Sequence, residues 1–247
     1  MTALAPGTPD LLATPPGFTL GGVVSDYQYR EPSVAVEERG VMAGLSAAYG
    51  FPFGRRARLR ADLEYLQGRL RYRGSGILDG VPDTRLEPRL TFGWDCFPWA
   101  RAGLSPYLGY GLRLTWNDLR GTTSTGARGY RRDATYRYLP LGCTARVAAG
   151  RGWVLAPTLE YDWLLGARVA SMLGDANTSF TEAINHPGGG HGVRASVLAE
   201  RGRVAFGPWV QSWSLGASET VPIGAGYTAQ EPGNRTLETG LAVTWRF

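Results

Sequence analysis

The sequence predicts an all-β protein, a single antiparallel up-and-down transmembrane β-barrel of about ten strands with short periplasmic turns and long extracellular loops. Three observations lead to this fold class. The C-terminal segment alternates between apolar and polar side chains, similar segments recur along the whole chain, and the connections between them alternate between short and long. An even number of strands with turns at one end and loops at the other is typical of bacterial outer-membrane barrels.

The segment 236–247 shows the alternation most clearly. Leu241, Val243 and Trp245 fall on one face of a strand, because successive side chains of a strand point to opposite sides. Glu238 and Arg246 fall on the other face. An apolar face that ends in aromatic residues is expected where a strand leaves a bilayer.

Nine further segments repeat this pattern between clusters of turn-forming residues. The predicted strands are Phe18–Arg30, Val36–Phe51, Ala57–Tyr72, Thr84–Phe97, Leu104–Asp118, Ala134–Ala148, Trp153–Ser171, His191–Glu200, Arg203–Leu215 and the C-terminal segment. The predicted short turns are Pro52–Arg55, Pro98–Gly103, Ala149–Gly152 and Arg201–Gly202. The predicted loops are Gly74–Asp83, Leu119–Arg132, Met172–Gly190 and Gly216–Asn234.

Residues 1–17 are set apart from the barrel, which is expected to occupy residues 18–247. This segment contains several prolines and lacks the basic region followed by an apolar region that marks a secretory signal peptide. A flexible Pro-rich N-terminal segment is therefore predicted.

The composition agrees with a membrane barrel and argues against other classes. No run of about 18 apolar residues is present, which excludes a transmembrane helix. A mean hydropathy of −0.18 fits a barrel, because half of each strand faces the interior. The net charge is +5, but the basic residues, all of them arginine, are spread over many strands. No nucleic-acid partner is expected, since nucleic-acid binding needs basic residues clustered on one face.

The polar faces of the strands carry charges of both signs along their length. In a transmembrane barrel these side chains point into the lumen, where unpaired charges are costly, so a balanced salt-bridge network is expected. The predicted lumen charge network is Arg58, Arg60, Asp62, Glu64, Arg85, Glu87, Arg89, Arg113, Arg146, Glu160, Asp162, Arg194, Glu238 and Arg246, to which the same pattern adds Asp95 and Glu200. A barrel of about ten strands is far narrower than an aqueous porin, so the interior should be closed or very constricted.

His186 and His191 lie at the predicted outer end of the connection between the seventh and eighth strands, with Asp175 and Glu182 nearby in the sequence. Imidazole titrates near neutral pH, so an acid–base or metal site is conceivable there. A glycine-rich loop with incidental histidines is the favoured interpretation. Cys96 and Cys143 match no metal or disulfide spacing and are read as small apolar residues. The sequence therefore predicts no enzyme activity, no catalytic residues, no metal and no cofactor.

Several segments resemble a widespread group of uncharacterised proteobacterial outer-membrane β-barrel proteins, porin-like and distinct from the omptin proteases. The segments that carry the resemblance are 27–32, 117–126, 129–132, 138–142 and 159–165. The resemblance covers essentially residues 18–247 and implies a membrane barrel without an activity that can be transferred. It also implies that Phe247, as a C-terminal aromatic residue, is read by the outer-membrane assembly machinery.

The expected function is that of an outer-membrane barrel with a narrow, charge-filled lumen and a surface-interaction or structural role carried by its loops. A narrow channel for small solutes is the first alternative, and an omptin-like surface hydrolase is a less favoured one. Expected partners are outer-membrane lipid, lipopolysaccharide and the assembly machinery. A soluble barrel remains open only if Arg113 points outward and Leu112 inward.

Overall fold

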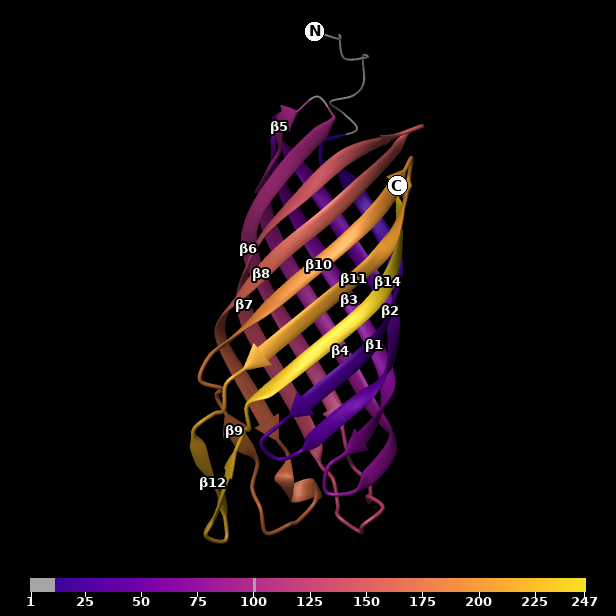
Figure 1. The fold of residues 1–247 in the computed structure, drawn as a ribbon. Coiled ribbons are helices and arrows are strands. Elements are labelled where there is room, and N and C mark those ends of the chain that lie inside the picture. Colours follow the sequence, from indigo (N-terminus) through magenta and orange to yellow (C-terminus); the bar gives the residue numbers. More distant parts are fainter. Residues whose placement is uncertain (1–11, 100) are drawn as a thin grey trace.

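Alternating side chains build the wall of a closed antiparallel barrel in the computed structural model, which describes residues 12–99 and 101–247 (Figure 1). Ten strands of the described chain form the wall, each paired with its neighbour in sequence, and β1 pairs with β14 to close it. They are β1 (Gly17–Glu31), β2 (Val36–Phe53), β3 (Ala57–Arg73), β4 (Ile77–Trp94), β6 (Ala102–Asp118), β7 (Arg131–Gly150), β8 (Trp153–Ser171), β10 (Gly190–Arg201), β11 (Val204–Leu215) and β14 (Asn234–Arg246).

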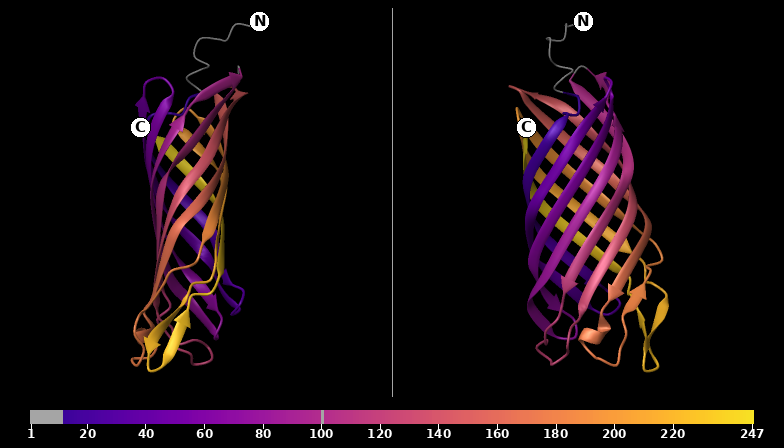
Figure 2. Two further views of the ribbon diagram at one scale, coloured as in Figure 1. Left: turned by 90° about the vertical axis from the view of Figure 1, so that its left-hand side faces the viewer. Right: turned by 180° about the vertical axis from the view of Figure 1, so that it is seen from behind.

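The predicted up-and-down barrel is thus confirmed, and most strand limits agree within a few residues. The described chain has no helix long and apolar enough to cross a membrane. The C-terminus and the short turns lie at one end, and the long connections lie at the other (Figures 1 and 2). Two of the turns are two-residue hairpins, in which Arg151 and Gly152 both adopt positive φ (51° and 78°) and Gly202 has φ 59°. Positive φ matches such tight turns to the twist of the strands.

Two predicted boundaries are wrong. β4 begins at Ile77, so most of the predicted loop Gly74–Asp83 is strand. Gly80 and Pro82 lie within this extension, where the β3–β4 pairing is bulged near Leu70, and they hide the alternation in the sequence. The predicted turn before β6 contains part of a short strand, β5 (Cys96–Trp99), which pairs with β6.

The two longest predicted loops also contain regular structure. The connection from β8 to β10 holds a short 3₁₀-helix (Leu173–Asp175) and β9 (Ala183–Asn185), and β9 extends the sheet beyond β8. The connection from β11 to β14 holds a hairpin of β12 (Thr220–Gly224) and β13 (Tyr227–Gln230). These pieces are too short to show a period in the sequence.

The N-terminal segment predicted as flexible lies mainly outside the described residues. Its described part, residues 12–16, packs against the barrel at the end with the short turns. Leu12 is buried, and the Thr14 hydroxyl donates to Asp95 Oδ1 at 2.8 Å.

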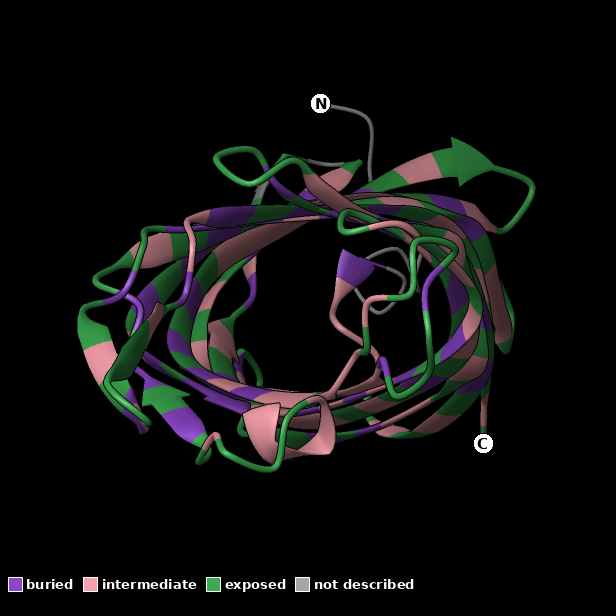
Figure 3. Ribbon diagram, turned by 90° about the horizontal axis from the view of Figure 1, so that it is seen from below, coloured by how far each residue is buried: buried purple, intermediate pink, exposed green. Residues whose placement is uncertain are grey.

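The two faces of the wall have opposite polarity. Large apolar side chains lie exposed on the outside, among them Leu45, Leu159 and Leu241, each about 60% exposed. Charged side chains are buried inside, where Arg85 and Arg113 are only 1% and 2% exposed. Viewed along the axis from the loop end, the strands form a closed ring in which exposed and less exposed residues alternate (Figure 3). A soluble barrel would have the reverse arrangement, so the soluble alternative, which needed Arg113 to point outward, is wrong.

Aromatic rings fill much of the interior because glycines on neighbouring strands leave room for them. Four lumenal rings lie directly opposite a glycine on an adjacent strand, in the pairs Tyr107–Gly142, Tyr138–Gly111, Trp209–Gly240 and Trp213–Gly192. A Cβ atom built on Gly111 would lie 2.3 Å from the Tyr138 ring. Such pairing of an aromatic ring with a cross-strand glycine stabilises sheets.

This packing predicts that Gly111→Val destabilises the barrel. The added side chain must displace Tyr138, which is fully buried and packs edge-on to Trp213 with ring centroids 5.1 Å apart. The expected loss is about 1–3 kcal/mol, the usual cost of overpacking. The urea midpoint of the refolded barrel, followed by tryptophan fluorescence, measures it.

The matched control is Gly22→Val on the outer face of β1, where a Cβ atom meets nothing within 4 Å. Its midpoint should stay at or above that of the parent chain. Equal midpoints for the two variants would show that the Tyr138 ring does not depend on the glycine opposite it.

Candidate functional site: the charged lumen

Glu87 on β4 is the centre of the charged layer that crosses the middle of the lumen. Its carboxylate is 1% exposed and forms an ion pair with Arg194 of β10 and another with Arg113 of β6, whose Nη1 lies 3.4 Å from Oε2. The Tyr138 hydroxyl on β7 donates a third hydrogen bond to it. Since β4 and β10 are separated by three other strands in the wall, the Arg194–Glu87 pair spans the interior.

A second pair crosses the lumen in another direction. Arg85 on β4 is paired with Glu238 on β14, and β1, β2 and β3 lie between these strands. The other Arg85 amino group lies 2.7 Å from Glu64 on β3, and Ser25 donates to Glu238 at 3.2 Å. Arginine suits this arrangement because its planar group donates in several directions at once.

Arg194 joins the layer around Glu87 to a second group of charges, which lies closer to the short turns. Its Nε lies 2.9 Å from Asp162 and 3.1 Å from Glu160, both on β8. Glu160 is also paired with Arg89 and accepts a hydrogen bond of 2.7 Å from Tyr107. Charges on six strands are thereby linked into one constriction. Buried pairs of this kind are stable only when the remaining donors and acceptors are also satisfied.

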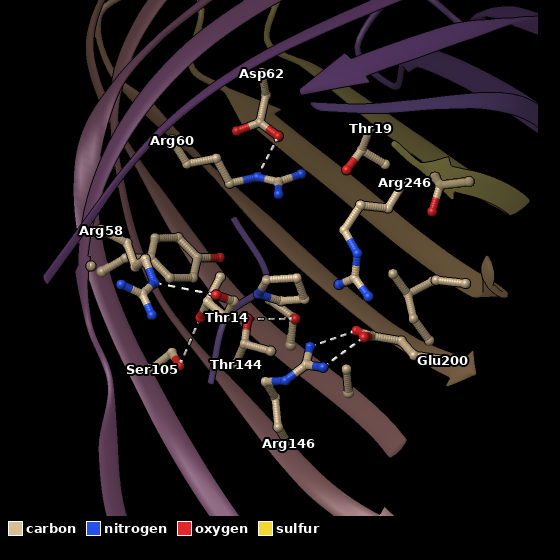
Figure 4. Close-up of a pocket in the computed structure, with 18 of the residues that line it drawn as sticks. Thr14, Thr19, Arg58, Arg60, Asp62, Ser105, Thr144, Arg146, Glu200 and Arg246 are labelled. Atoms are coloured by element: carbon tan, nitrogen blue, oxygen red, sulfur yellow. Dashed lines mark hydrogen bonds and ion pairs between the residues drawn. The ribbon is translucent and has the colours of Figure 1, made fainter. Parts of the chain in front are cut away.

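The lumen is wider on the side of the short turns. A cavity of about 300 Å³ lies there, and the residues that line it include Thr14, Arg58, Arg146 and Glu200 (Figure 4). Arg146 and Glu200 form a bidentate pair with both distances at 2.7 Å. A neighbouring cavity of about 220 Å³ shares Arg89 and other lining residues with it.

Thr14 ties the N-terminal segment into this cavity. Its hydroxyl and backbone N–H both donate to Asp95, and Arg58 Nε donates to the Thr14 carbonyl at 3.2 Å. Arg58 also lies 3.3 Å from Asp95, and Ser105 donates to the same carboxylate at 2.7 Å.

Toward the loops the lumen narrows again. Asn117 donates to Glu38 at 2.7 Å and to Asp83 at 2.9 Å, and both carboxylates are buried. Further out, Arg132 at the start of β7 is paired with Glu31 of β1 and with Glu231. The outer mouth is therefore bridged by its own ion pairs.

All the residues of the predicted network except Arg246 take part in these ion pairs or, for Arg60 and Asp62, in a pair of 2.8 Å along β3. Arg246 donates instead to the Gly202 carbonyl at 2.7 Å. The interior also contains residues outside the predicted network, which are Tyr138, Arg132 with its two acids, and the Glu38–Asn117–Asp83 group. Tyr138 and Arg132 are in phase with Ala134 and Tyr136 on β7, and extending that alternation would have found them.

The two histidines do not join an acid group in the part of the chain that the structure describes. His186 Nδ1 hydrogen-bonds with the Ala167 carbonyl at 3.2 Å, and His191 stacks on Tyr161 on the exposed outer face with centroids 5.7 Å apart. Within the described ranges no cluster of His, Cys, Asp or Glu fits a metal ion. Cys96 and Cys143 are half-buried free thiols.

The two acids near the histidines in the sequence, Asp175 and Glu182, form ion pairs with arginines. Asp175 lies 2.8 Å from Arg131, and this hydrogen-bonded pairing lowers the pKa of the Asp175 carboxyl below its usual value. Glu182 lies 3.8 Å from Arg168. The Asp175 pair is thus held as the pH falls through the normal range of aspartate and lost only below it.

The outer loops form two packed groups. In one, Thr123 and Thr125 of the β6–β7 loop donate to the Ser75 carbonyl of the β3–β4 turn, and Ser124 accepts from the Ile77 N–H at 3.0 Å. In the other, Asn185 donates to Ser218 at 3.0 Å and so joins β9 to the β11–β14 connection. The loop surface therefore has a defined shape.

Comparison with known proteins gives matches only at the level of structure, since no family model and no curated protein matches the sequence. The outer-membrane protease OmpT from Escherichia coli matches with a TM-score of 0.55 and 10% identity over 95% of this chain and 98% of that one. The translocator domain of the autotransporter NalP from Neisseria meningitidis matches with a TM-score of 0.43 and 15% identity over 96% and 91%. An outer-membrane channel from Pseudomonas putida F1 has a TM-score of 0.41 and 13% identity over 99% and 100%.

The likeness to OmpT shows a shared fold and nothing about activity. That fold has an apolar exterior and a charged, ion-paired interior in this chain. The chain therefore has the fold of a transmembrane β-barrel, like those of bacterial outer-membrane proteins.

Proposed function

We propose that this protein is a non-conducting, non-enzymatic outer-membrane barrel whose loop surface carries an interaction or structural role. The observation that supports it most directly is the layer of ion pairs around Glu87, which joins strands on opposite sides of the lumen. Ions would have to break these pairs in order to pass. The bridged Arg132 mouth and the packed loops support the same function.

A narrow solute channel is the second candidate, and the cavities favour it. The space of about 300 Å³ on the side of the short turns adjoins the one of about 220 Å³, so the lumen on that side offers room for a small solute. The two functions differ in whether the layer around Glu87 opens. Electrical conductance distinguishes them directly.

The proposed function predicts that the double variant Arg194→Ala/Glu87→Ala conducts ions. The variant removes one cation and one anion from the constriction, so the net charge is unchanged while the side chains that fill the lumen are lost. In planar bilayers the parent chain should show no steady current, and the double variant should show discrete conductance steps. Heat-modifiable migration on a gel verifies that each variant is folded.

The matched control is Arg146→Ala/Glu200→Ala, the same chemical change in the wider part of the lumen. It should remain closed, because the layer around Glu87 is intact. A steady current through the parent chain would overturn the proposed function and support the channel. If both variants conduct equally, the barrier does not lie at Glu87.

The proposed function also predicts that the β6–β7 loop is held in a fixed conformation. Thr123→Val/Thr125→Val removes both hydroxyls that bind the Ser75 carbonyl, and the β6–β7 loop contains Arg120 and Arg128 as trypsin sites. Because each lost hydrogen bond weakens the closed loop by about 1 kcal/mol, limited trypsinolysis of the refolded barrel should accelerate by roughly tenfold or more.

Thr178→Val is the control, since Thr178 is exposed in a different loop and its hydroxyl has no hydrogen-bond partner among the described residues. Its cleavage rate at Arg120 and Arg128 should equal that of the parent chain. Rapid cleavage of the parent chain at these arginines would contradict a fixed loop surface.

A further inference from the structure

Six exposed arginines gather on the outer face of four neighbouring strands, close to the loop end. They lie on β14, β1, β2 and β3, and we refer to them as the basic ledge: Arg235, Arg30, Arg39, Arg69, Arg71 and Arg73. Their alternation with buried residues along each strand places them on the lipid-facing side. The lumen network uses none of them.

The register brings like charges together on this ledge. Arg39 of β2 lies directly opposite Arg71 of β3, and Arg30 of β1 lies directly opposite Arg235 of β14. Directly opposed residues have their Cβ atoms about 5 Å apart, and like charges there are destabilising. Two such pairs side by side need anions to offset the repulsion.

Acidic side chains of the protein offset only part of the repulsion between these arginines. Glu37, Asp26 and Asp79 pair with Arg30, Arg39 and Arg71 at 3.5, 2.8 and 3.0 Å. The remaining arginines, Arg69, Arg73 and Arg235, form no ion pair with a carboxylate in the described part of the chain. Arg69 donates to the Gly80 carbonyl at 3.2 Å. Six arginines against three acids leave a net charge of +3 on the ledge.

The far side of the barrel shows that such an excess is not general. On the outer face of β7 and β8 and the following loop, Arg131, Arg137 and Arg168 are matched by Asp133, Asp175 and Glu182. Two of these arginines form ion pairs with these acids, Arg131 with Asp175 and Arg168 with Glu182. The positive excess is therefore a property of the β14–β1–β2–β3 face.

The ledge lies immediately beyond the apolar belt. On β2, Val41 lies two residues from Arg39 on the same face and is 61% exposed. On β3, the outward-facing residues that follow Arg69 toward the short turns are Gln67, Tyr65 and Leu63. Tyrosine marks the level at which a barrel meets the lipid headgroups. The arginines thus lie at the headgroup level of the outer leaflet.

We propose that the basic ledge binds the phosphate groups of a phosphorylated glycolipid of the outer leaflet, the lipid A part of lipopolysaccharide. Arginine pairs with phosphate through two parallel hydrogen bonds, and a phosphate between Arg39 and Arg71 converts their repulsion into attraction. The apolar belt below the ledge receives the acyl chains. This site lies on the outside of the wall and is independent of the lumen.

The experiment titrates the refolded full chain in detergent with lipid A carrying both phosphates and measures the bound fraction by native mass spectrometry. The variant Arg39→Ala/Arg71→Ala should bind about thirtyfold more weakly, from the usual contribution of basic residues near an anionic lipid surface. The control Arg137→Ala/Arg168→Ala should stay within about twofold of the parent chain. Migration before and after heating verifies that both variants fold.

Three further ligands test whether the bound phosphate belongs to lipid A, to another anionic lipid or to free phosphate. Dephosphorylated lipid A should lose binding, phosphatidylglycerol should bind more weakly than lipid A, and inorganic phosphate at the same concentration should not compete. Equal binding of the two variants, or of lipid A with and without phosphate, overturns the proposal. Full competition by inorganic phosphate, or equal binding of phosphatidylglycerol, overturns the assignment to a glycolipid.

Discussion

The structure depends on one electrostatic constraint, which is that a charge inside a narrow barrel must find its partner inside the same barrel. The interior has a low dielectric constant, so an unpaired ion there costs several kcal/mol while a well-placed pair is strongly attractive. Glu87, Arg194 and Arg85 satisfy this constraint by reaching across the lumen. The same pairs that neutralise the interior also occupy much of its middle, so charge balance and interior packing are linked.

The aromatic residues follow from this constraint. Rings such as Tyr138 and Tyr107 supply hydroxyl donors to Glu87 and Glu160 and occupy volume that the arginines leave. They fit because glycine stands opposite each of them, as Gly111 and Gly142 do. The high glycine content of the chain therefore serves interior packing as well as turns.

The period-two pattern was enough to predict the barrel and the strand number, but it did not lead to the interior charges of Arg132, Glu38 and Asp83. It could not predict which acid meets which arginine, because that depends on how strands separated by three others face each other across the lumen. Arg60 illustrates the limit, since it pairs with Asp62 on its own strand rather than across the lumen. Bulges near Leu70 and Tyr138 shift the pairing without any sequence signal. The short β9 and β12 were missed because a period needs more residues than they have.

The pair between Arg85 and Glu238 has a consequence for how the wall comes apart. In a sheet held only by neighbouring strands, an end strand can peel away and leave the remainder intact. Here β14 is tied to β4 as well as to β1 and β11, so peeling it removes one of the counterions of the buried Arg85. Partly opened forms of the barrel are therefore raised in free energy as soon as β14 detaches. The barrel is built to open and close as a single cooperative unit.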